Sequence, residues 1–148
     1  MVSSVPVKKR SKEQIAAEIE DIRQASADGL LRPADVVDRA RDPGNILHPN
    51  FEWEDSKAAE SYRLWQARQL IVTFVVAIGP QQRVVQQYIS LTSDRKEAGY
   101  RSTIEVLSDA DYRKQLLADA LQELRTFKRK YALLKELADV FAAADALE

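Results

Sequence analysis

The chain lacks cysteine and contains only one histidine, His48, among its 148 residues. The absence of cysteine excludes disulfide bonds, thiolate nucleophiles and zinc sites with cysteine ligands. There is no second histidine, no glycine-rich phosphate-binding loop and no Gly-x-Ser-x-Gly motif. We therefore expect a protein that is not an enzyme and that needs no cofactor and no metal.

Long hydrophobic runs and an excess of one charge are also missing. No stretch of about 18 apolar residues occurs, and the first 20 residues lack the apolar core of a signal peptide. These absences predict a cytoplasmic protein without a membrane partner. With 22 Lys and Arg against 23 Asp and Glu, the formal net charge is −1, so only local basic patches could attract nucleic acid.

The length and composition fit one globular domain that is large enough to bury its own core. Residues 1–10 have no hydrophobic periodicity and end in a basic cluster, which predicts a flexible arm. Residues 11–148 are expected to form a single α+β domain that is mainly helical. Its predicted parts are an N-terminal helical hairpin, a central helix, a β-hairpin and a long C-terminal helix.

The N-terminal hairpin is predicted from helix start and stop signals. Ser11 and Gln14 have the spacing of a capping box, and a helix over 12–27 would end at Asp28-Gly29. Pro33 suits the first turn of a second, shorter helix that ends at the turn-forming residues 42–45. The two helices are therefore expected to pack against each other.

The segment 48–71 combines His48, both tryptophans and several acids. His48 with Glu52, Glu54 and Asp55 includes metal-ligand residue types, but their spacing matches no metal motif. The Asp55-Ser56-Lys57 string is similar to the acid-x-lysine element of some nucleases, yet no upstream acid is placed to complete such a site. Asp55 or Ser56 instead predicts the N-cap of a central helix.

Residues 72–91 predict a β-hairpin because β-branched residues flank the turn-like Gly-Pro-Gln-Gln-Arg string. Two strands are marginally stable alone, so they need helices or further strands beside them. Residues 100–107 carry helix and strand signals of comparable strength, and the sequence leaves both open.

The C-terminal part predicts a helix over about 109–144, opened by Ser108 with Asp111 and free of glycine and proline. Its apolar residues alternate in spacings of three and four, as in a heptad repeat: Leu117, Ala120, Leu124, Phe127, Tyr131, Leu134, Ala138 and Phe141. This face could pack on the chain's own helices or on another subunit. We expect a homo-oligomer, most simply a dimer, with an interface comprising Leu117, Leu124, Phe127, Tyr131, Leu134 and Phe141.

Basic residues gather in three places: Lys8, Lys9, Arg10 and Lys12 in the arm; Arg83, Arg95, Lys96 and Arg101 around the hairpin; and Arg125, Lys128, Arg129 and Lys130 in the long helix. Only the first and last groups are dense, and both are candidate nucleic-acid-binding sites for DNA or RNA. The alternative for the long helix is a solvated face balanced by Glu123, Glu136 and Asp139.

The string Phe-Glu-Trp-x-Asp-x-x-Ala-Ala-x-x-Tyr-Arg at 51–63 also carries a resemblance. Together with GLLRPADVVDRARDP upstream and YISLTSDRKEAGYR and LLADALQELRTFKRKYALLKEL downstream, it resembles a family of small proteins encoded by bacteriophages and prophages. The resemblance covers most of residues 12–145. It implies a phage context, and thus a host-cell cytoplasm, but no catalytic residue.

Two functions are compatible with these features. The first is a phage-type accessory protein that oligomerises and binds nucleic acid without strong sequence preference. The second is a structural or interaction protein of phage assembly or host takeover that docks through its long C-terminal helix.

Overall fold

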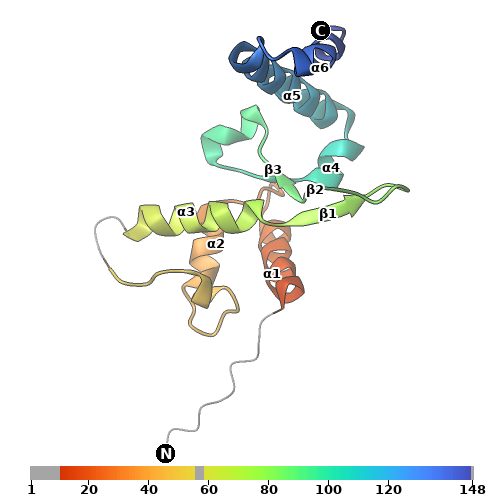
Figure 1. The fold of residues 1–148 in the computed structure, drawn as a ribbon. Coiled ribbons are helices and arrows are strands. Elements are labelled where there is room, and N and C mark those ends of the chain that lie inside the picture. Colours follow the sequence, from red (N-terminus) through yellow and green to blue (C-terminus); the bar gives the residue numbers. More distant parts are fainter. Residues whose placement is uncertain (1–10, 56–58, 148) are drawn as a thin grey trace, which may run out of the picture.

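A computed structural model describes residues 11–55 and 59–147 of the chain. Its elements, in which η marks a 3-10 helix, are α1 (Lys12–Ala25), α2 (Pro33–Ala40), η1 (His48–Asn50), α3 (Ala59–Val72), β1 (Val75–Ile78), β2 (Arg83–Gln86), β3 (Tyr88–Ile89), η2 (Thr92–Glu97), β4 (Arg101–Ser102), α4 (Thr103–Ser108), α5 (Ala110–Tyr131), η3 (Lys135–Leu137) and α6 (Ala138–Asp145). The predicted fold class is confirmed. Figure 1 shows α1 and α2 at one end of the molecule, α5 and α6 at the other, and α3 with the β1–β2 hairpin across the middle.

The helix starts of the N-terminal hairpin follow the predicted signals. The Ser11 side chain accepts a hydrogen bond from the Gln14 amide at 3.1 Å, and the Gln14 side chain accepts one from the Ser11 amide at 3.1 Å. This capping box satisfies amides that the first helical turn leaves free. Gly29 takes a φ of 72°, a left-handed conformation that glycine adopts without strain, and turns the chain after α1.

The hydrophobic core lies where α1, α2 and α3 meet the strand region. Val36, Val37 and Ala40 of α2 are fully buried, as are Ala67 and Ile71 on the facing side of α3. Burying such apolar side chains is the main favourable term in folding. The predicted cap Ser56 lies outside the described residues, while the Asp55 carboxylate accepts a long hydrogen bond from Arg63 at 3.4 Å.

The strands form two small antiparallel pairs. In the predicted hairpin, β1 and β2 run antiparallel. Val75 lies opposite Gln86 at one end of the pair, and Ile78 lies opposite Arg83 at the other. β3 then pairs with β4, and Leu31 pairs with Tyr100 through two backbone hydrogen bonds of 2.8 Å. Residues 100–107 therefore hold both predicted structures, because 100–102 are extended and α4 begins at Thr103.

The C-terminal helix begins within one residue of the predicted start, but its cap is Asp109 and not Ser108. Ser108 ends α4, and the side chain of Asp109 caps α5 by accepting hydrogen bonds from the amides of Asp111 and Tyr112, both at 3.0 Å. Asp109 is thus the joint between the two helices.

The predicted extent of that helix, about 109–144, was also wrong. α5 ends at Tyr131, and the chain reverses so that α6 packs against α5. The rings of Phe127 and Phe141 lie 6.1 Å apart, and Lys128 forms a 2.7 Å ion pair with Asp145. In a continuous helix, Phe141 would lie far from Phe127. The reversal brings the two rings together and buries Phe141.

A partly buried polar network connects α1 with β3 and α4. The Tyr88 hydroxyl, in a side chain that is 1% exposed, donates to the Glu20 carboxylate at 2.7 Å. Arg23 donates to Glu20 at 2.6 Å and to Glu105 at 3.1 Å. Burial alone would raise the pKa of Glu20, but the hydrogen bonds from Arg23 and Tyr88 outweigh it and hold that pKa below 4.5.

Replacing Tyr88 by Phe is expected to lower the free energy of unfolding by about 1–3 kcal/mol, because the half-buried Glu20 carboxylate loses a hydrogen-bond donor. Urea denaturation followed by circular dichroism measures the change. Tyr62→Phe is the matched control, since Tyr62 is 47% exposed and should change stability by less than about 0.5 kcal/mol. Equal effects of the two substitutions would contradict the network's role.

The network also predicts a pH dependence. Because the pKa of Glu20 is lower in the folded than in the unfolded state, ionised Glu20 stabilises the fold above about pH 4.5, and this contribution is lost as the pH falls through the folded-state pKa. The stability difference between the wild type and Glu20→Gln should therefore shrink between pH 7 and about pH 3. Urea titrations at each pH measure it, and a constant difference would exclude this linkage.

Candidate interaction surface

α5 is the longest helix, yet none of its 22 residues, all of which the structure describes, is buried. Leu117 is 53% exposed and Phe127 is 42% exposed, whereas Leu116, Leu121 and Leu124 are half-buried. A helix in a single-domain protein ordinarily hides one apolar face against the core. The apolar face of α5 is therefore only partly covered by its own chain.

Polar contacts attach the first half of α5 to the rest of the molecule. Asp119 accepts hydrogen bonds from the Thr92 amide at 2.9 Å and the Thr92 hydroxyl at 2.7 Å, and Gln115 accepts one from Ser93 at 2.9 Å. The Arg101 guanidinium lies 4.2 Å from the centre of the Tyr112 ring. These contacts use the polar side of the helix, and Leu117 stays about half exposed.

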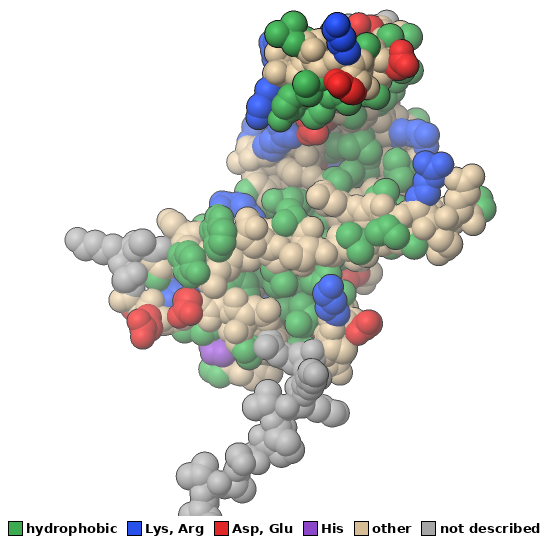
Figure 2. Space-filling model, in the orientation of Figure 1, with side chains coloured by type: hydrophobic (Ala, Val, Ile, Leu, Met, Phe, Trp, Pro, Cys, Tyr) green, Lys and Arg blue, Asp and Glu red, His purple; other side chains and the backbone are tan. Residues whose placement is uncertain are grey.

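The uncovered apolar side borders a hollow of about 580 Å³ at the joint between α4 and α5. Its lining residues are Leu107, Ala110, Arg113, Lys114, Leu116, Leu117 and Ala120. Figure 2 shows hydrophobic side chains on the surface of the C-terminal helices and in the recess between them and the hairpin. Contiguous exposed apolar surface of this kind marks sites of protein association.

The six residues predicted for an oligomer interface divide into two groups. Phe141 is buried inside the chain, and Phe127 and Tyr131 contact each other at 4.7 Å between ring centres. Leu117 and Leu134 are about half exposed, and Leu133 beside Leu134 is 95% exposed. Leu124 is half-buried near α6. The heptad residues thus pack partly within the chain and partly face outward.

The predicted nucleic-acid-binding residues are also divided. Arg125, Lys128 and Arg129 line one hollow of about 400 Å³ beside Asp145, which pairs with Lys128. Lys130 lies instead over the Tyr131 ring, 5.2 Å from its centre. The remaining predicted residues are in the N-terminal region: Lys12 is exposed in the first turn of α1, and Lys8, Lys9 and Arg10 lie outside the described residues.

The segment around the only histidine is an anchor for α3. The His48 ring donates through Nδ1 to the Ala40 carbonyl at 2.8 Å and stacks on Trp53 with ring centres 4.8 Å apart. Trp53 donates to the His48 carbonyl at 2.8 Å. Arg63, only 4% exposed, donates to the Glu52 carbonyl at 2.8 Å and lies 5.0 Å from the centre of the Trp53 ring. Sequence reasoning missed Arg63, because burial of an arginine leaves no local signal.

No group of three or more His, Asp and Glu side chains within 11–55 and 59–147 is arranged to hold a metal ion. Of the nuclease-like string, Ser56 and Lys57 lie outside these residues.

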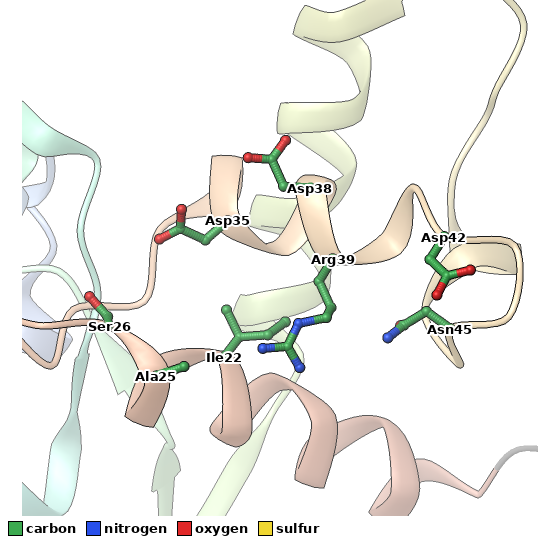
Figure 3. A pocket seen from close by; sticks show the side chains of 8 residues that line it. All are labelled: Ile22, Ala25, Ser26, Asp35, Asp38, Arg39, Asp42 and Asn45. Carbon is green, nitrogen blue, oxygen red and sulfur yellow. The ribbon is translucent and has the colours of Figure 1, made fainter.

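A hollow of about 610 Å³ lies between α1, α2 and the turn after α2. Figure 3 shows Asp35, Asp38 and Asp42 around it, with Arg39 near its centre. Arg39 bridges Glu18 and Asp21 at 2.9 Å each. Its guanidinium therefore belongs to the packing between α1 and α2.

Comparison of the chain with protein-family models, curated protein sequences and solved structures finds no match. The resemblance to phage-encoded proteins thus stays a prediction. Among the described helices, none combines the length and the apolar character needed to cross a membrane.

Phe141→Ala is expected to release α6 from α5, because Phe141 is the buried residue of α6 and a large-to-small substitution in a packed site costs about 3–5 kcal/mol. Hydrogen exchange should then show lost amide protection over 138–145 while α1 and α2 stay protected. Val140→Ala, at a position that is 50% exposed, is the control. Protection in α6 that survives Phe141→Ala would show that other contacts hold the helix.

Proposed function

We propose that this protein is a non-enzymatic binding protein that self-associates through α5 and α6. The observation that carries the proposal is the absence of any buried residue in α5, all of which is described, although the helix has a continuous apolar face. A second copy would cover Leu117, Phe127 and Leu134, which are exposed in the single chain. Burial of each such side chain contributes on the order of 1–2 kcal/mol.

The charges of α5 favour an antiparallel contact between two copies. Its last two turns carry Arg125, Lys128, Arg129 and Lys130. At its start the acids Asp109 and Asp111 balance Arg113 and Lys114, and its middle carries Asp119 and Glu123. A parallel pair would bring the basic ends together. A two-fold antiparallel pair instead brings the basic end of each helix to the uncharged start and acidic middle of the other.

Leu117→Glu should dissociate the oligomer without unfolding the chain. The side chain is 53% exposed in the single chain, so a carboxylate there stays hydrated in the monomer but would be buried between two copies. We expect the dissociation constant to rise by about a hundredfold, measured by light scattering and sedimentation at micromolar concentration.

Val72→Glu is the control, because Val72 is a 39% exposed apolar residue on α3. It should leave the oligomer intact. A wild-type protein that is monomeric at micromolar concentration, or equal dissociation by both substitutions, would contradict self-association through α5.

A nucleic-acid-binding role in a phage context is the second candidate. The convergence of Arg125, Lys128 and Arg129 on one hollow supports it, because a local cation cluster can bind phosphates despite a net charge of −1. The ion pair between Lys128 and Asp145 weakens it, because this ammonium is already held by a carboxylate. Self-association would place two such clusters on one nucleic acid and multiply a weak affinity.

Substitution of Arg125, Lys128 and Arg129 by Gln tests this second candidate. Glutamine keeps the helix propensity, and the loss of about two to three phosphate contacts should reduce the slope of log K against log salt by roughly 2 to 3 on duplex DNA. Fluorescence anisotropy with random-sequence probes measures the affinity from low to physiological salt. A salt slope that the triple substitution leaves unchanged would remove these residues from any nucleic-acid contact.

A further inference from the structure

Apart from Glu60, which pairs with Arg41 and Arg63 in the first turn of α3, the segment that forms α3 and the hairpin has no acidic side chain. Residues 61–93 contain none of the protein's 23 Asp and Glu residues, but they include Arg63, Arg68, Arg83 and six glutamines. Figure 1 shows that α3 leads directly into β1, so helix and hairpin form one bar across the molecule. The bar would not repel a polyanion.

The outward side of α3 carries residue types suited to contact with a partner. Tyr62 and Trp65 are 47% and 50% exposed, and their rings stack with centres 5.7 Å apart and an interplanar angle of 14°. Arg68 and Gln69 follow on the same side of the helix and are exposed. The opposite side of α3 is buried against α2, so this outward side is the one available for binding.

The arginines of the bar differ from those of the surrounding body. Carboxylates hold six arginines in the N-terminal and central parts of the chain: Arg23, Arg32, Arg39, Arg41, Arg63 and Arg101. Within the described residues, no carboxylate contacts Arg68 or Arg83, and Arg83 donates only to the neutral Gln81 at 3.0 Å. The charges of Arg68 and Arg83 are therefore free to neutralise phosphates.

We propose that the outward face of α3 and the β1–β2 hairpin form a binding surface for duplex DNA. The major groove admits either an α-helix or a two-stranded β-ribbon, and this bar contains both. Arginine and glutamine can contact base edges as well as phosphates, and Gln69, Gln81 and Gln82 are exposed beside the two free arginines. Tyr62 and Trp65 would extend the contact along the sugar-phosphate backbone.

This surface is separate from the Arg125, Lys128 and Arg129 cluster and from the apolar face of α5. It does not depend on self-association. DNA binding through the bar, phosphate binding through α5 and oligomer formation are thus each tested by a different set of variants.

The test is fluorescence anisotropy of the full chain with a random-sequence duplex and a single strand of the same length, each from low to physiological salt. The double variant Arg68→Gln with Arg83→Gln should weaken duplex binding at least about tenfold. It should also reduce the slope of log K against log salt by about 1.8, because two phosphate contacts are lost. Circular dichroism checks that the variant keeps its fold.

The matched control is Arg95→Gln with Lys96→Gln, which removes the same charge from exposed residues of η2. Retained affinity in this control and lost affinity in the double variant support the proposal. Equal losses in both, no loss in the double variant, binding to the single strand alone, or no duplex binding by the wild type at low salt would each overturn it. Loss only in the Arg125, Lys128 and Arg129 triple variant would overturn it too and assign binding to α5.

Discussion

The half-buried carboxylate of Glu20 is the interaction on which the arrangement of the chain depends. It is held by Tyr88 from β3 and by Arg23, which also contacts Glu105 of α4. A charge in this place is tolerated only because its hydrogen-bond partners are present, so removing one of them leaves an uncompensated group. Since α4 leads into α5, the same network helps to fix where the C-terminal helices begin.

The two ends of the molecule are stabilised by different forces. Around α1, α2 and α3 a continuous apolar core excludes water, whereas α5 is attached through Asp119, Gln115 and the Arg101–Tyr112 contact. Few buried apolar contacts and many exposed polar ones are the features of regions that open locally before the whole protein unfolds. The C-terminal helices are therefore expected to open before the core of α1, α2 and α3, and a partner that covers them would stabilise them.

Local signals were predictable from the sequence, and distant contacts were not. The Ser11–Gln14 box and Pro33 act within one helical turn, so the starts of α1 and α2 could be read directly. The end of α5 could not, because no glycine or proline marks the reversal after Tyr131 and the heptad spacing continues through it to Phe141. The same holds for the candidate basic surface. The spacing of Arg125, Lys128 and Arg129 alone predicts that they share one face of the helix, but the pairing of Lys128 with Asp145 depends on the reversal of the chain.

Because Asp109 caps α5 directly after α4, the number of residues at this joint determines which side of α5 faces the protein. Asp109 is the single residue between the end of α4 and the start of α5. One residue inserted into the first turn of α5, after this cap, would rotate the rest of the helix by about 100° and advance it by about 1.5 Å along its axis. Thr92 would then face Ala118 in place of Asp119, and the two hydrogen bonds that Asp119 accepts from Thr92 would be lost. The direction in which α5 presents its apolar face thus depends on the one-residue joint at Asp109 and on the turn that follows it.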